Sequence, residues 1–176
     1  MSCLHLPDLK HTITNYVEIQ SYLQGKGIHY ERWELPVAVA EDADEKTVLS
    51  AYRDFLAPYM EKQGYQTADV VCVHAGTPQV GEVRKKFLSE HTHSEDEVRF
   101  FVKGRGLFWF HLPETPIFSV LCQEGDLLSV PAGVQHWFDI GETPYVKAIR
   151  MFLDPQGWIA QYTHSKVEAR YAEFSL

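Results

Sequence analysis

The spacing of apolar residues changes along the chain, from helical spacing in the first half to strand-like spacing after it. Apolar residues three and four positions apart predict helices over residues 15–24, 44–63 and 80–90. Pro58 lies inside the second of these, and because proline lacks an N–H group we expect a kink or a break there. Residues 28–35 and 68–75 are predicted as strands.

From residue 97 onward, short apolar stretches alternate with glycines and prolines. This pattern predicts strands over residues 98–102, 107–112, 117–122, 127–130, 136–139 and 146–152. Many short strands joined by Gly and Pro turns favour a β-sandwich or a barrel. After Gly157 the pattern is mixed, and we expect the tail to end in a short helix or in disordered residues.

Composition and charge narrow the class of protein. The 176 residues are enough for one domain with its own core, and the formal net charge is −8 without any run of Lys or Arg. A nucleic-acid partner would need a basic patch, so we exclude one. No apolar run has the length of a membrane span, and the first residues lack a basic stretch followed by an apolar one. We therefore expect a cytoplasmic protein without a membrane partner.

The three cysteines do not indicate a structural framework. Cys3, Cys72 and Cys122 are odd in number and far apart, which predicts neither a disulfide network nor a zinc site. We expect Cys72 and Cys122 to be small buried hydrophobic residues.

The candidate chemistry is concentrated in residues 87–104. His91, His93 and Glu97 are spaced H-x-H-x3-E, and Arg99 follows two positions later. Alternate residues of an extended strand point to the same face. These four odd-numbered side chains are therefore predicted to share one face.

A second stretch, residues 125–136, reads G-x5-P-x-G-x2-H and ends at His136. Together the two stretches resemble the two sequence motifs of the cupin superfamily. Lys85 stands where the first motif begins with Gly, and Ile140 stands where the second ends with Asn. Both departures lie outside the candidate ligands, so they affect local turns rather than the ligand set.

The resemblance becomes narrower over four segments. Residues 87–108, 126–133, 136–139 and 157–160 are similar to the acireductone dioxygenase family. This resemblance implies a mainly β (α+β) fold, a cupin jelly-roll β-barrel with a few peripheral helices, mostly N-terminal. It also implies a single domain over residues 1–176, with a helical and strand extension over about residues 1–80 and the metal-binding barrel over about residues 81–160.

Three imidazoles and one carboxylate suit a first-row divalent metal and leave room for two further ligands. We predict that His91, His93, Glu97 and His136 bind one metal ion per chain, and the resemblance implies that this ion is Fe²⁺ or Ni²⁺. The alternative is a barrel interior of hydrogen-bonded histidines without a metal.

Three further residues are candidates for catalysis. Arg99 cannot lose its proton, so a buried Arg99 needs an anion. That anion is either a bound enediolate or, alternatively, an interior carboxylate in a structural salt bridge. Glu90 and Glu95 flank the ligands and could accept a substrate proton or orient a ligand imidazole. Solvated surface carboxylates are the alternative for this pair.

Aromatic residues near the motifs are candidates for an apolar pocket. We predict that Phe87, Phe138 and Trp158 line it, with Phe138 on the same face as His136. Core packing is the alternative. The histidines outside the motifs are expected to have ordinary roles: His5, His11, His29, His74, His111 and His164.

The resemblance implies a dioxygenase of methionine salvage. Its substrate is the enediol ketone 1,2-dihydroxy-5-(methylthio)pent-1-en-3-one, which O₂ cleaves. The iron form of such enzymes gives a 2-keto acid and formate, whereas the nickel form gives methylthiopropionate, formate and carbon monoxide. The implied partners are this small molecule and O₂, and we expect a monomer. Two alternatives are another cupin enzyme, such as a sugar-phosphate isomerase, and a non-enzymatic metal-binding cupin.

Overall fold

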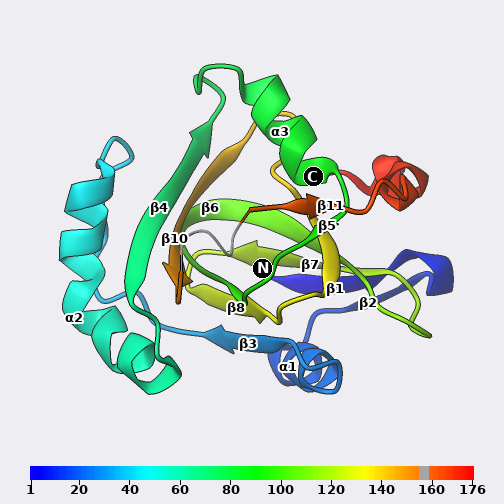
Figure 1. Ribbon diagram of the computed structural model, residues 1–176, viewed down its shortest axis with the longest axis horizontal. Helices are drawn as coiled ribbons and strands as arrows, with labels where there is room; N and C mark the ends of the chain where they lie inside the picture. The colour runs from blue at the N-terminus through cyan, green and yellow to red at the C-terminus, as the bar shows by residue number, and fades with distance from the viewer. Residues whose placement is uncertain (155–158) are drawn as a thin grey trace.

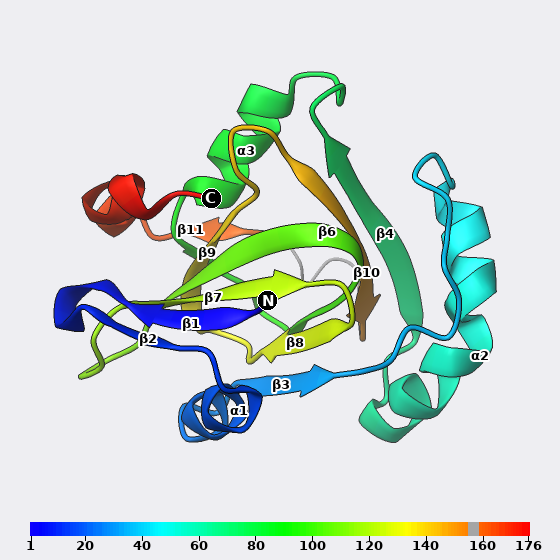
Figure 2. The ribbon, with the colours of Figure 1, turned by 180° about the vertical axis from the view of Figure 1, so that it is seen from behind.

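The computed structural model describes residues 1–154 and 159–176. Antiparallel strands curl around a common centre, and helices lie outside this barrel (Figures 1 and 2). The helices are α1 (Tyr16–Gln24), α2 (Glu45–Gln63), α3 (Val80–Leu88) and the 3-10 helices η1 (Pro7–Leu9) and η3 (Val167–Phe174). The strands are β1 (Cys3–Leu6), β2 (His11–Ile13), β3 (His29–Arg32), β4 (Thr67–His74), β5 (His91–Thr92), β6 (Glu97–His111), β7 (Phe118–Gln123), β8 (Asp126–Val130), β9 (Gln135–Asp139), β10 (Tyr145–Phe152) and β11 (Gln161–Tyr162). The predicted mainly β fold with peripheral helices is confirmed.

β6 is the strand around which the barrel is built. It pairs with β7, β8, β9 and β10, in each case antiparallel. The two strands predicted over 98–102 and 107–112 are therefore one strand, which runs through Gly104. Gly104 has φ +70°, and a Cβ there would lie 1.8 Å from the carbonyl oxygen of Tyr145. Only glycine permits this approach of β10 to β6.

Alternate residues of β6 serve different apolar clusters. Phe101 and Phe108 belong to the cluster inside the barrel. Val98 and Phe100 belong to a second cluster, which the residues of α2 complete from outside. Trp109 belongs to a third cluster, which η3 helps to cover. This alternation leaves the inner face of β6 available for a site, while the outer face holds the helices in place.

Two of the predicted helices begin where expected, and one expected break is absent. Asn15 caps α1, because its side chain accepts hydrogen bonds from two backbone N–H groups of the first turn at 2.9 and 3.2 Å. Asp44 caps α2 in the same way, through the backbone N–H of Thr47 at 2.8 Å. α2 continues through Pro58, so of the predicted kink or break the break is wrong, and the kink stays a prediction. Pro58 is exposed, so water can replace the hydrogen bond that proline cannot make, and the buried face of α2 holds the helix against the barrel.

The two cysteines predicted to be buried differ. Cys122 is buried in the barrel, as expected, whereas Cys72 is exposed, so that prediction is wrong. Cys72 lies on β4, on the same face as Ala68 and Val70. Those two residues pack against the cluster that α2 covers, and Cys72 lies further along the strand, where it reaches solvent.

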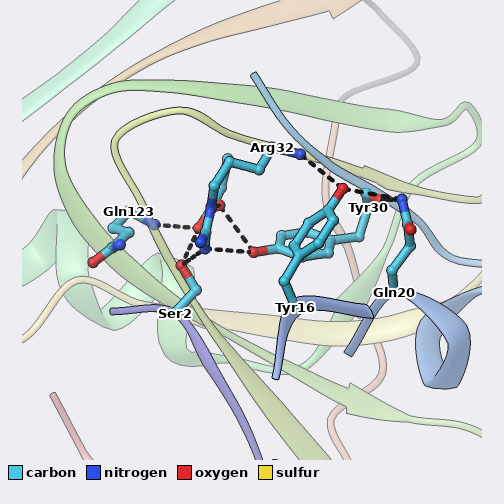
Figure 3. A network of polar contacts seen from close by, with 7 residues as sticks. Ser2, Tyr16, Gln20, Tyr30, Arg32 and Gln123 are labelled. Atoms are coloured by element: carbon cyan, nitrogen blue, oxygen red, sulfur yellow. Dashed lines mark hydrogen bonds and ion pairs between the residues drawn. The ribbon is translucent and has the colours of Figure 1, made fainter. Parts of the chain in front are cut away.

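A buried carboxylate ties the first residues and β3 to the barrel (Figure 3). Asp126, which is 0% exposed, accepts hydrogen bonds from Ser2 Oγ at 2.5 Å and Tyr30 Oη at 2.9 Å. Arg32 Nε donates at 3.0 Å and the backbone N–H of Gln123 at 2.9 Å. The N-terminal extension is thus anchored to β8, with which β3 also pairs.

Among the helices of residues 1–154 and 159–176, none combines the length and the apolar character that crossing a membrane requires. The cytoplasmic location and the monomeric state stay predictions. The expected short helix of the tail is present as η3.

Candidate metal centre

The four candidate ligands come together in space. His91 lies on β5, Glu97 on β6 and His136 on β9, and His93 directly follows β5. His91 and His136 are register partners on neighbouring strands. One possible ligand atom from each of the four residues lies within 4.8 Å of the others, and all four residues are between 1% and 7% exposed. The structure therefore contains the buried cluster that the spacing predicted.

Backbone carbonyl groups determine which ring nitrogen faces the centre. His91 Nδ1 lies 2.7 Å from the carbonyl oxygen of Ser89, and His136 Nδ1 lies 2.8 Å from that of Val134. Each Nδ1–H therefore donates to a carbonyl oxygen, and Nε2 is the ring nitrogen that remains to face the centre. His136 Nε2 lies 2.8 Å from Glu97 Oε2. A divalent metal can take the place of the proton on Nε2, so three imidazoles and one carboxylate converging on one point form a donor set that fits a bound divalent metal.

The protonation states of the cluster are those that metal ligands need. Burial alone would raise the pKa of Glu97, but Arg99, His136 and His93 outweigh burial and hold that pKa well below its usual range. Burial, together with the nearby His136, lowers the pKa of His91 to about 4. At neutral pH, Glu97 is therefore an anion and His91 a neutral imidazole, each ready to donate electron pairs.

Arg99 lies beside the cluster. Its Nε donates a hydrogen bond to Glu97 Oε1 at 2.6 Å, and the two side chains are 4% and 1% exposed. The structural salt bridge considered as an alternative is therefore present, and its partner is itself a candidate ligand. Because a guanidinium carries five N–H donors, this ion pair is compatible with a second anionic partner.

The flanking carboxylates have partners outside the cluster. Glu90, which is 2% exposed, accepts hydrogen bonds from Thr163 Oγ1 at 2.5 Å and Ser165 Oγ at 2.7 Å, and lies 2.7 Å from His111 Nδ1. Burial would raise the pKa of Glu90, but these hydrogen bonds outweigh it and lower the pKa. Glu95 is half-buried and accepts a hydrogen bond from a backbone N–H just after β10 at 2.9 Å. Sequence reasoning missed the three partners of Glu90, which lie 21 to 75 residues away along the chain without any local signal.

The predicted pocket residues Phe87 and Phe138 face Arg99. The guanidinium carbon lies 5.5 Å from the centre of the Phe87 ring and 4.4 Å from that of Phe138. A third ring, Phe108, lies 5.4 Å away and was not predicted. Trp158, the remaining predicted pocket residue, lies outside the described residues. A role of these rings as a pocket wall stays a prediction.

An antiparallel β-barrel that gathers three imidazoles and one carboxylate in its interior is a metal-binding cupin. A model of the ARD/ARD' family matches residues 7–160 of this chain. The chain therefore belongs to the ARD/ARD' family.

Individual relatives agree with this assignment. The chain is 49% identical to an acireductone dioxygenase of a Picosynechococcus species over 176 residues, which is 100% of both chains. It is 51% identical to one of Gluconobacter oxydans over 159 residues, which is 90% of this chain and 84% of the relative. The solved structure of acireductone dioxygenase from Bacillus anthracis with a cadmium ion in its active centre gives a TM-score of 0.84 at 30% identity. That match covers 92% of this chain and 98% of the other.

Proposed function

We propose that this protein is an acireductone dioxygenase that cleaves 1,2-dihydroxy-5-(methylthio)pent-1-en-3-one with O₂ in methionine salvage, using one Fe²⁺ or Ni²⁺ ion per chain. One observation carries the proposal: three buried imidazoles and the Glu97 carboxylate converge within 4.8 Å, beside the buried guanidinium of Arg99. A relative named acireductone dioxygenase, 49% identical over the whole chain, supports the choice of reaction.

The proposed ligands are His91, His93, Glu97 and His136. Imidazole and carboxylate donors suit Fe²⁺ and Ni²⁺ alike, so the ligand set supports both ions. A bound divalent metal supplies a Lewis acid and a template that orients the substrate.

Arg99 is the proposed binding group for the substrate anion. Because a guanidinium keeps its proton, it favours the ionised form of an enediol that lies next to it. Because Arg99 is only 4% exposed, water screens the charge of its guanidinium only weakly. Glu97, at 2.6 Å, holds the guanidinium next to the ligand cluster, where the reacting oxygens of a bound substrate would lie.

The two flanking carboxylates have different proposed roles. A lowered pKa makes the Glu90 carboxylate a weak base, so its hydrogen bonds favour a role in orienting the adjacent His91 and its strand. Glu95, half-buried, is our candidate for accepting the substrate proton. Phe87, Phe138 and Trp158 are proposed to enclose the methylthio tail.

Metal exchange tests the proposal. The protein is stripped with a chelator, separate samples are loaded with Fe²⁺ or Ni²⁺, and oxygen uptake and products are measured with the acireductone. We expect the 2-keto acid and formate from the iron sample, and methylthiopropionate, formate and carbon monoxide from the nickel sample. Identical products from both samples would remove the dual chemistry and leave a dioxygenase. No oxygen uptake from either would favour an isomerase or a binding protein.

A ligand variant controls for adventitious metal. His93→Ala removes one of the four donors, so most of the metal should be lost from the purified protein by elemental analysis. Full occupancy in this variant would contradict the four-ligand centre.

A further inference from the structure

The ring of Phe138 lies directly over the backbone of Gly106. A Cβ at Gly106 would lie 2.2 Å from Cζ and 2.3 Å from Cε2 of that ring, far inside van der Waals contact. Gly106 is not among the glycines with positive φ, so its backbone conformation accepts alanine. The ring alone therefore excludes a side chain at this position.

The same ring also contacts Arg99 in the barrel interior. Phe87, Phe108 and Phe138, here called the aromatic box, place their ring centres 4.4 to 5.5 Å from the guanidinium carbon of Arg99. The ring centres of Phe108 and Phe138 are 4.6 Å apart, and both residues are at most 1% exposed. Rings in such contact attract a cation through their negative faces.

The ion pair and the aromatic box act on Arg99 in different ways. Glu97 accepts a hydrogen bond from Nε of the guanidinium at 2.6 Å and balances its charge. The rings contact the guanidinium group itself and restrict how far its plane can turn. They also exclude water, so the charge acts through a medium that screens it weakly.

We propose that Gly106 and Phe108 are positioning residues for Arg99. Gly106 provides the space in which the Phe138 ring reaches the guanidinium, and Phe108 fixes that ring from its side. The inference rests on the proposed function, because it explains how the anion-binding group is oriented before the substrate arrives.

Gly106→Ala tests the proposal, with Gly81→Ala as the matched control. Gly81 lies in α3, and a Cβ there would meet nothing within 4 Å. The readout is the Nε–H signal of Arg99 in NMR spectra of the zinc-loaded protein, assigned by its loss in Arg99→Lys. We expect hydrogen exchange at Nε–H to be at least about 10-fold faster in Gly106→Ala, and kcat/KM for the acireductone to fall roughly 2- to 30-fold, the range of a cation–π contact. Gly81→Ala should change neither, and an unchanged Nε–H signal in Gly106→Ala would overturn the proposal.

Two further variants separate steric strain from the contact with the cation. Gly106→Ala should lower the melting temperature, because its new methyl group meets Cε2 and Cζ of Phe138. In the double variant Gly106→Ala/Phe138→Leu these ring atoms are absent. The double variant should therefore regain the melting temperature, but hydrogen exchange at Arg99 Nε–H should stay fast. Replacing Phe108 by 3,4,5-trifluorophenylalanine keeps the ring's shape and weakens its negative face. Faster exchange with an unchanged melting temperature supports positioning, and unchanged exchange shows that Phe108 only packs.

The NMR measurement does not depend on turnover. If the wild-type protein takes up no oxygen with the acireductone, the proposed function fails, and the exchange rates at Arg99 still decide whether Gly106 and Phe108 position it.

Discussion

Replacing Glu97 by glutamine should destabilise the metal-free protein strongly. The glutamine side chain would keep the shape of the glutamate, but the group that faces Arg99 Nε at 2.6 Å would lose its charge. Both side chains are at most 4% exposed, so the guanidinium would stay buried without its anion. Removing one partner of a buried ion pair costs about 3–5 kcal/mol, and in a domain of this size each kcal/mol lowers Tm by about 2–4 °C. The expected fall is roughly 6–20 °C.

The assay is thermal unfolding in the presence of a chelator, which removes the stabilisation that metal binding adds to the wild-type protein. The control is Glu97→Gln/Arg99→Met, in which both charges are absent. Replacing a whole buried pair by neutral side chains of similar volume is often tolerated, so this double variant should regain most of the lost Tm. A Tm of Glu97→Gln within about 2 °C of the wild type would refute the reasoning. It would mean that water reaches Glu97 and Arg99 and screens the interaction between their charges.

Three further predictions follow from individual side chains. Arg99→Ala should retain metal by elemental analysis but lose about 2–5 kcal/mol of transition-state stabilisation, measured as kcat/KM; near wild-type turnover would make Arg99 purely structural. The pKa of His91 is lowered from 6.5 to about 4, so the unfolded chain binds one more proton between these values. The metal-free protein should therefore lose up to about 1.4 kcal/mol of stability per pH unit as the pH falls through this range, and His91→Gln should show a shallower loss in urea unfolding. Asp126→Asn should cost about 1–3 kcal/mol in the same assay, because the buried hydroxyl groups of Ser2 and Tyr30 lose a charged acceptor.

The clustering of the candidate ligands could be predicted from sequence because most of their spacing is local. His91, His93 and Glu97 lie within seven residues of one another, so the short connection between β5 and β6 keeps them close although it is not itself extended. His136 lies far away in the chain, and only the second motif indicated that it joins them; the pairing of β5 with β9 brings it there. The strand regions followed from apolar stretches between Gly and Pro turns for the same local reason.

The features that could not be predicted depend on contacts between distant segments. The partners of Glu90 come from β6 and from the segment after β11, at separations that no motif encodes. The exposure of Cys72 depends on how far α2 extends over β4, which the apolar pattern of β4 alone does not reveal. Pro58 is tolerated because it lies on the solvent side of α2, and that too is set by the packing of the helix.

A single β-bulge in β6 explains how one strand places both the charged side chains of Glu97 and Arg99 and the ring of Phe108 in the barrel interior. Opposite β10, the register of β6 shifts between Lys147 and Ala148, which places one extra residue on β6. Such a bulge reverses which side chains face inward. Inward positions are odd before it, giving Glu97 and Arg99, and even after it, giving Gly106 and Phe108. Without the shift, Phe108 would face away from the barrel interior, and Arg99 would lose one of the three rings that contact it among the described residues. The bulge is therefore as much a part of the candidate site as the candidate ligands are.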